Sequence, residues 1–453
     1  LWIGTPGGGL NRLHDGRITA LTTENGLPGD MVWTIHGGRE GSLWLGVVAA
    51  GLVRLSDGAF VTYGKPEGLS ADIALAVRED RSGALWVGTA GGGVNRLGDG
   101  RITTFKAAGG LAHDIVISLA EARNGDIWVG TAVGGISRIR DGRVRTYRAA
   151  DGVIAGPIAA ILEDRAGNLW LGGTGGGLQR WRSGAPDPDN EPAHYTRADG
   201  LPDDHVTSLL EDTSGRLWIG TRSGLARLED ERIVRVPIEG APPVNSIRAL
   251  HEDVDGTIWI ATHGGVVRLR GERLFHFGEA EGMIERETHA ITSDRHGYLW
   301  LSSNQGIFRV SRHELNDVAE GRRDRVRPQR FGRPDGLRSG EANGGVQPGV
   351  WERGDGTIWF PTMAGIATVD PARVEPRPPI PPPVMEQVVA GDSVYLARAA
   401  LELPPEQRTL EMHFTAPDFF EPGRVHFRYM LEGYDPAWVE AGDRRVAYYT
   451  NVP

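Results

Sequence analysis

Residues 115–147 have the sequence IVISLAEARNGDIWVGTAVGGISRIRDGRVRTY. Four short apolar runs, at 115–121, 126–131, 136–139 and 143–147, are separated by Asn-Gly, Gly-Gly and Asp-Gly pairs. Short runs bounded by such residues predict β-strands, and Asp-Gly between two of them predicts a tight hairpin with positive φ. The stretch therefore predicts four antiparallel strands, which we call a, b, c and d in chain order.

The same unit recurs along the chain, and a tryptophan in strand b marks each copy. Four successive intervals are 42 residues, and the next four are 48, 41, 41 and 59 residues. The nine markers are Trp2, Trp44, Trp86, Trp128, Trp170, Trp218, Trp259, Trp300 and Trp359. The Asp-Gly hairpin recurs at Asp15-Gly16, Asp57-Gly58 and Asp99-Gly100. A period of about 40–45 residues built from strands is typical of β-propeller blades.

Three segments differ in composition. Repeat units fill residues 1–375, with a polar insertion at His313–Arg327 that we place in a c–d hairpin. Residues 376–383, PRPPIPPP, predict a stiff linker. Residues 384–453 alternate apolar and polar residues, which predicts a small Ig-like β-sandwich, truncated at its C-terminus. The predicted fold class is therefore all-β: a β-propeller of four-stranded antiparallel blades followed by a small sandwich.

Charge and composition exclude several function classes. The 49 Lys and Arg and 59 Asp and Glu give a net charge of −10, which argues against nucleic acid as a partner. Without cysteine the chain has no disulfide, thiolate metal site or cysteine nucleophile. No run approaches the ~18 consecutive apolar residues of a membrane span. Because the sequence begins without Met and inside a repeat, we expect a fragment of a longer protein.

The repeated text W-x-G-T-x-x-G-G, then D-G-R, G-L-P and E-D-x-x-G-x-L-W resembles the two-component regulator propeller repeat. Asp335–Glu341 (DGLRSGE) and Thr357–Thr362 (TIWFPT) resemble the last blade of such sensors. Phe414–Phe419 (FTAPDF) and Phe427–Asp435 (FRYMLEGYD) resemble the three-Y domain that follows them. The resemblance covers essentially the whole chain.

This family consists of the extracytoplasmic sensor regions of bacterial membrane-bound signalling proteins. The resemblance therefore implies a periplasmic location, a transmembrane segment outside this sequence and a cytoplasmic output such as a histidine kinase. It also implies a small-molecule or glycan ligand and a homodimer in the full-length protein. We expect no cofactor. Members usually have two seven-bladed propellers. We therefore favour seven units in one ring, Trp86 to Trp359, plus two blades of a first propeller, over one larger ring.

Antiparallel strands place the b–c turns and the d–a connectors on one face of the disc, which we call the connector face. We expect the ligand there, because these loops vary most in charged and aromatic content. Each of these side chains is also compatible with an ordinary solvated loop charge. The candidates on connectors are Asp72, His113, Asp114, Asp204, His205, Glu285, Arg286 and Glu341, and those on b–c turns are Arg222, His263 and Asn304.

The aromatic residues divide into expected core and expected ligand contacts. The tryptophans of strands b are expected to fill the space between blades, because a buried indole contributes a large apolar area. Trp33 and Trp351 lie in strands a, which makes them better candidates for ligand contact. The residues expected in the core of the sandwich are Tyr429, Tyr434, Trp438 and Tyr448.

No motif predicts catalysis. The Gly-rich b–c turns precede strands, whereas phosphate loops precede a helix. The histidines lack metal-ligand spacing, and no Gly-x-Ser-x-Gly elbow is present, although a Ser/His/Asp triad stays open. We therefore predict a non-catalytic sensor. The alternatives are a protein-interaction scaffold and a propeller lyase or glycosidase, whose two carboxylates the connectors could supply.

Overall fold

The computed structural model describes residues 1–453 except 39–41, 183–185, 187–190, 239–245, 285, 375–380, 397–400, 404–406, 419–424 and 453. It divides the chain into two compact units, Leu1–Val374 and Glu375–Pro453. Part of the expected linker, residues 376–380, lies outside the described residues. Within the described ranges the chain is almost entirely β, which confirms the predicted fold class.

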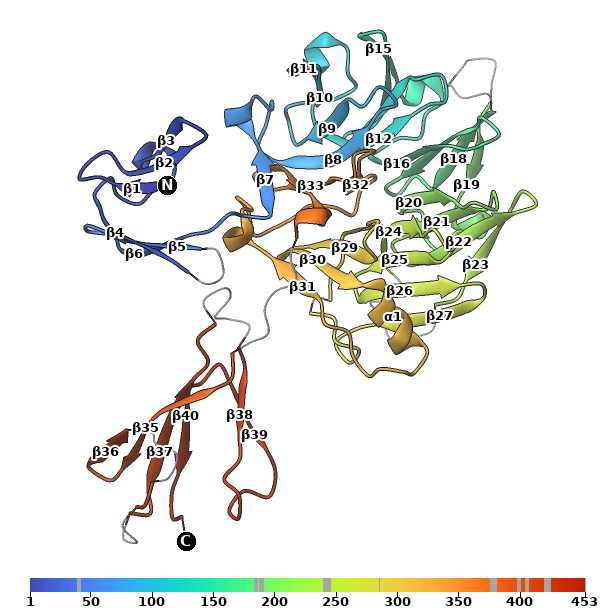
Figure 1. The fold of residues 1–453 in the computed structure, drawn as a ribbon. Helices are drawn as coiled ribbons and strands as arrows, with labels where there is room; N and C mark the ends of the chain where they lie inside the picture. Colours follow the sequence, from blue (N-terminus) through green and yellow to red (C-terminus); the bar gives the residue numbers. More distant parts are fainter. Residues whose placement is uncertain are drawn as a thin grey trace. The chain divides into compact units, whose positions relative to one another are not determined.

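Seven four-stranded sheets dominate the first unit (Figure 1). Six are meanders of consecutive strands. Their bounds are β8 (Ala74–Glu79), β9 (Leu85–Thr89), β10 (Val94–Gly98) and β11 (Arg101–Phe105); β12 (Val116–Glu121), β13 (Ile127–Thr131), β14 (Ile136–Arg140) and β15 (Arg143–Tyr147); β16 (Ile158–Glu163), β17 (Leu169–Gly173), β18 (Leu178–Trp181) and β19 (Ala193–Tyr195); β20 (Val206–Glu211), β21 (Leu217–Thr221), β22 (Gly224–Glu229) and β23 (Arg232–Val236); β24 (Ile247–Glu252), β25 (Ile258–Thr262), β26 (Gly265–Arg270) and β27 (Arg273–Phe277); β28 (Ala290–Ser293), β29 (Tyr298–Ser303), β30 (Gly306–Ser311) and β31 (Gln329–Phe331).

The seventh sheet closes the ring. It has the order β32-β33-β34-β7, from β32 (Trp351–Glu352), β33 (Ile358–Thr362), β34 (Gly365–Val369) and the early strand β7 (Phe60–Tyr63). Each inner strand contacts the next around the circle, and β32 contacts β8. Phe60 fixes β7 in the core, with ring centroids 5.4 Å from Phe331 and 6.4 Å from Trp300. The first and the last strand of the ring, β7 and β34, are therefore paired in one sheet.

The position of β7 corrects one sequence prediction. Asp15-Gly16, Asp99-Gly100 and Asp141-Gly142 all have positive φ at both residues, as a tight hairpin requires. Asp57-Gly58 does not, because the strand before it, β6 (Gly51–Leu55), does not pair with β7. Gly58 instead packs on Asp335 and Gly336, where an added Cβ would lie 2.7 Å from the Asp335 carbonyl oxygen. At Asp57-Gly58 the chain thus leaves the sheet of β6 and continues into β7 of the closing sheet.

The seven tryptophans of strands b in the ring are buried between sheets, as predicted, with 8% exposure at most. In five sheets the indole Nε1 donates to an aspartate six residues earlier, for example Trp218 to Asp212 at 2.8 Å. In the sheet that begins with β12 this position is Ala122, and the buried Nε1 of Trp128 has no hydrogen-bond partner among the described residues. The E-D-x-x-G-x-L-W motif is thus explained by packing.

Neighbouring sheets are also joined by glutamates that end the inner strands. Glu121 accepts from the backbone N–H of Arg81 at 3.0 Å, in the a–b turn of the preceding sheet. Glu163, Glu211, Glu252 and Glu79 repeat this contact around the ring. At the corresponding position β28 has Ser293, whose Oγ lies 2.8 Å from His251 Nε2. The joint between β24 and β28 is therefore built differently.

Two three-stranded sheets precede the ring. They contain β1 (Trp2–Gly4), β2 (Leu10–His14) and β3 (Arg17–Leu21), and β4 (Val32–Gly37), β5 (Leu43–Val47) and β6. Trp33, a candidate for ligand contact, is 73% exposed on β4. The insertion after β30 forms helix α1 (Arg312–Ala319), which buries Leu315 and Val318 against the core.

The second unit has two sheets. Their strands are β35 (Val384–Ala390), β36 (Ser393–Leu396), β37 (Leu410–Thr415) and β40 (Val446–Tyr449), and β38 (Phe427–Tyr429) and β39 (Val439–Gly442). Phe414, Phe427 and Tyr449 are buried in its core. Of the four aromatic residues expected there, only Tyr429 packs against the core. Tyr434, Trp438 and Tyr448 are 41, 52 and 56% exposed, so that prediction was wrong. Side chains alternate along β40, which turns Tyr449 inward and Tyr448 outward.

Candidate functional site

Three of the predicted connector residues have a shared structural contact. Asp72, Asp114 and Asp204 each accept the backbone N–H of the residue seven positions earlier, at 3.0, 2.7 and 2.7 Å. That residue opens a short 3-10 helix in each connector, so the carboxylate satisfies one of its unpaired N–H groups. Asp30 makes the same contact with Thr23. Because this contact recurs at the same position of several repeats, the aspartates are structural caps of the short helices in the connectors.

Two other predicted residues meet in a hydrogen-bonded group, which we call the connector cluster: His263, Glu287, His289 and Asn304. Glu287 Oε1 lies 3.0 Å from His263 Nε2, and Glu287 Oε2 accepts from Asn304 Nδ2 at 3.1 Å. Asn304 Oδ1 lies 2.8 Å from His289 Nε2. His263 and Asn304 come from two b–c turns, and Glu287 and His289 from the connector before β28. The side chains of His263 and Glu287 are about one-third exposed, at 37 and 34%.

Electrostatics favours a neutral imidazole at the inner end of the connector cluster. Burial is the main cause that lowers the pKa of His289, and the positive charge of Arg248 adds to it. The hydrogen bond with Asn304 and the charges of Glu287 and the predicted residue Glu341 act in the opposite direction on this pKa. A neutral His289 donates through Nε2 to the Asn304 carbonyl. The cluster thus presents a carboxylate, an amide and two imidazoles from three loops.

A second group lies on the neighbouring loops. His205 Nδ1 is 2.9 Å from Asp203 Oδ1, and Ser223 Oγ donates to Asp203 Oδ2 at 2.7 Å. Although burial would raise the pKa of Asp203, the hydrogen bonds from Ser223 and His205 lower it. Because Ser223 bonds the carboxylate and not the imidazole, this group lacks the nucleophile–base contact of a triad. The predicted residue Arg222 has an exposed side chain beside it.

The remaining predicted residues do not join either group. His113 Nδ1 accepts the backbone N–H of Ile115 at 3.0 Å. Arg286 forms an exposed ion pair with Glu279, with Nε to Oε1 at 2.9 Å. Glu285 lies outside the described residues. Sequence reasoning named Glu285 and Arg286 in this connector and missed Glu287 and His289, since only the path of the loop decides which side chains turn toward the b–c turns.

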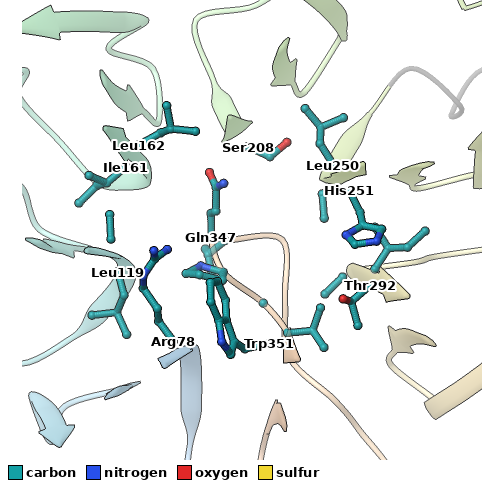
Figure 2. Close-up of a pocket in the computed structure, with 18 of the residues that line it drawn as sticks. Arg78, Leu119, Ile161, Leu162, Ser208, Leu250, His251, Thr292, Gln347 and Trp351 are labelled. Carbon is teal, nitrogen blue, oxygen red and sulfur yellow. The ribbon is translucent and has the colours of Figure 1, made fainter. Parts of the chain in front are cut away.

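A cavity of about 460 Å³ occupies the centre of the ring (Figure 2). Its walls come from the inner strands of all seven sheets. Apolar side chains include Leu119, Ile161, Leu162 and Leu250, and polar ones include Arg78 and His251. Trp351, the other tryptophan singled out from the sequence, lines this cavity, with the Arg78 guanidinium carbon 4.7 Å from its ring centroid.

Residues 343–350, which we call the crossing segment, run across the central cavity before β32 begins. Sequence reasoning missed this segment. Gln347 bonds three sheets: its N–H donates to the Ala159 carbonyl, its own carbonyl accepts from Leu119 N, and its side chain pairs with both backbone groups of Leu209. Gly345 N donates to the His289 carbonyl at 3.1 Å. The crossing segment thus links the cavity to the connector cluster.

No group of three or more His, Asp or Glu side chains among the residues that the structure describes is placed to hold a metal ion. None of the described helices is both long enough and apolar enough to cross a membrane.

Two protein-family models match parts of the two units. The two component regulator propeller model matches residues 110–132, 152–175, 200–223 and 242–264, and the Y_Y_Y domain model matches residues 418–453. These matches confirm the resemblance drawn from the repeats. A comparison with curated proteins finds no match.

Solved structures share the fold. The extracellular domain assigned to the hybrid two component system BT3049 of B. thetaiotaomicron aligns with a TM-score of 0.74 and 21% identity over 100% of this chain. That of BT4673 from the same organism aligns with a TM-score of 0.57 and 17% identity. The chain spans 62 and 63% of their lengths. Virginiamycin B lyase from Staphylococcus aureus aligns at 0.52 and 17% identity, with 69% of this chain and 98% of the lyase covered. At these identities the likeness concerns the fold.

Proposed function

We propose that this chain, which carries two component regulator propeller repeats and a Y_Y_Y domain, is the ligand-sensing part of an extracytoplasmic signalling region. The support comes from the architecture. A closed ring holds loops rigidly on one face, and a separate small β unit follows it. Rigid scaffolds that present polar loops are typical of binding proteins.

The connector cluster is the observation that carries this proposal. Glu287, Asn304 and His263 offer acceptors and donors that are still partly open to solvent. Such side chains match the hydroxyl groups of a sugar, each of which can donate and accept. We therefore take an oligosaccharide as the ligand class. Ligand binding must then favour one of two arrangements of the protein, because only differential affinity can shift such an equilibrium.

The rest of the signalling protein belongs to the same proposal. The Y_Y_Y unit would relay the change toward a transmembrane segment and a cytoplasmic output outside this sequence, in a periplasmic, dimeric assembly. The net charge of −10 and the lack of a basic stripe speak against nucleic acid as the partner.

The test is a thermal-shift screen of the purified chain against a library of glycan fragments, followed by calorimetric titration of each hit. A ligand that binds only the folded state raises Tm by mass action. Glu287→Gln should weaken binding of the hit at least about tenfold, because the charge-assisted hydrogen bonds of the carboxylate are lost. Glu279→Gln is the matched control, since it removes an exposed carboxylate from the same connector.

The outcomes separate the alternatives. A hit that Glu287→Gln leaves unchanged would place the ligand elsewhere on the chain. No hit across the library, together with capture of a protein partner, would favour the scaffold. Release of new reducing ends or unsaturated products from a bound polysaccharide would favour the lyase or glycosidase.

A further inference from the structure

Arg78 is a cation in the central cavity, and its guanidinium forms no ion pair with any residue that the structure describes. It extends from β8 into the interior of the ring beside Trp351 (Figure 2). Its Nε has no access to solvent and no hydrogen-bond partner among the described residues. Burial lowers the pKa of its guanidinium, with the charge of Glu121 acting in the opposite direction. The stacking on Trp351 holds the guanidinium plane but satisfies none of its N–H groups.

The acidic neighbours of Arg78 have other partners. Glu121 accepts the backbone N–H of Arg81 at 3.0 Å and lies 3.9 Å from the Arg81 guanidinium. Glu352 faces Arg295, with Oε1 to Nε at 3.5 Å, and burial raises its pKa. A buried guanidinium without an anion is unfavourable unless something else supplies the charge and the acceptors. The arrangement therefore calls for an anion from outside the chain.

The cavity also restricts what that anion can be. Its volume of about 460 Å³ is in the range of small-molecule sites. About half of its wall is apolar, including Leu119, Ile161, Leu250 and Trp351. Glu121, Glu163 and Glu352 line the same space together with a second arginine, Arg248, so the lining holds more carboxylates than guanidinium groups and disfavours a multiply charged anion. A single carboxylate on an apolar body meets all of these conditions, because a guanidinium binds a carboxylate through two parallel hydrogen bonds.

We infer that the centre of the ring is a binding site for a small organic monocarboxylate, with Arg78 holding the carboxylate and Trp351 and the apolar wall holding its body. This site is distinct from the connector cluster and does not depend on it. The crossing segment at 343–350 contacts both places, through Gln347 at the cavity and Gly345 at His289. A ligand in the cavity would therefore lie against the segment that adjoins the face of the ring.

The experiment uses the whole chain and two probes, benzoate and hexanoate, with benzamide and hexanamide as their neutral counterparts. Titration followed by calorimetry and tryptophan fluorescence should give saturable binding of a carboxylate. The matching amide should bind at least about tenfold more weakly, because it lacks the charge that Arg78 pairs with. Arg78→Gln should reduce carboxylate affinity by a similar factor. Arg81→Gln, at an exposed cation in the following turn, should not.

A stability measurement separates binding from a structural role. If Arg78 is a ligand group, Arg78→Met removes an unpaired buried charge, and the variant should melt at or above the Tm of the parent chain while no longer binding the probe. A lower Tm for Arg78→Met with unchanged carboxylate binding would overturn the inference. So would saturable binding of phosphate with none of the carboxylates, and so would no saturation by either probe. The glycan titration with Glu287→Gln reports on the connector cluster independently.

Discussion

Two parts of the ring follow different rules. In the regular part, from β8 to β27, each sheet is one continuous stretch, and a glutamate at the end of each inner strand ties it to a neighbouring turn. In the closing part, the sheets of β28 and β32, Ser293 replaces that glutamate, the inner strand β32 has two residues, and β7 arrives from the other end of the chain. The cavity segment and most of the connector cluster also belong to the closing part. The connector cluster and the crossing segment thus lie where the ring departs from the repeat.

The largest expected effect tests closure itself. Phe60→Ala should lower the free energy of unfolding by about 3–5 kcal/mol, because it leaves a cavity among Phe331, Trp300 and Phe360. Val61→Ala on the same strand, at a 55% exposed side chain, should change it by less than about 0.5 kcal/mol. Urea unfolding of both variants measures the contrast. If Phe60→Ala lowered the free energy of unfolding no more than Val61→Ala, the Phe60 side chain would contribute little, and β7 would be held by its backbone hydrogen bonds.

The next effect tests the joint where Ser293 replaces glutamate. Burial lowers the pKa of His251 from 6.5 to about 4, so the unfolded chain binds more protons between these pH values. The stability that His251 contributes is complete above pH 6.5 and is lost as the pH falls toward 4, by up to about 3 kcal/mol. His251→Gln should therefore flatten the dependence of unfolding free energy on pH between 6.5 and 4.5.

His313, on the exposed side of helix α1, is the control for that measurement. His313→Gln removes an exposed imidazole and thereby reports the effect of a histidine substitution outside this joint. If His251→Gln has the same slope as the parent chain, another group titrates at this joint.

A smaller effect tests the regular part against itself. Trp218→Phe removes an indole that donates to Asp212, whereas Trp128→Phe removes one whose Nε1 has no partner among the described residues. Both lose similar apolar area, so Trp218→Phe should cost about 1–2 kcal/mol more than Trp128→Phe. Denaturant titration of the two variants gives this difference directly. The reverse order would mean that the Asp–Trp contact contributes nothing net.

The smallest expected effect concerns the surface of the closing part. Arg286 and Glu279 form an exposed pair, and Arg286→Gln should change the unfolding free energy by less than about 0.5 kcal/mol. Thermal melts at low and high salt should overlap for parent and variant. A loss above about 1 kcal/mol would show that this connector is part of the folding core.

Local patterns predicted the blades well, since the four strands of residues 115–147 match β12 to β15 within a residue at most boundaries. What the sequence did not reveal is long-range. Nothing near Phe60 indicates that β7 pairs with β34, some 300 residues later, because register with a distant strand leaves no local period. The crossing segment is likewise defined by its partners in three other sheets.

The candidate site divides in the same way. His263 and Asn304 were named from the sequence and do share Glu287, because both occupy b–c turns of adjacent sheets. The aspartates at 72, 114 and 204 were named for their charge, yet their regular recurrence was itself the signal of a structural cap. A residue that serves one ligand has no reason to recur in each unit. Arg78 was not named from the sequence, because its Nε lacks a hydrogen-bond partner among the described residues only once the ring is packed.

The closing sheet has a mechanical consequence. The chain enters the ring at Phe60 and leaves it at Val369, and these two residues are paired at the same end of the β7–β34 ladder. Pulling on the segment before the ring and on the unit after it would therefore break the four residue pairs between β7 and β34 one after another. The other six sheets would not carry this force. The ladder between β7 and β34 is thus the part of the ring that would open first under such a load.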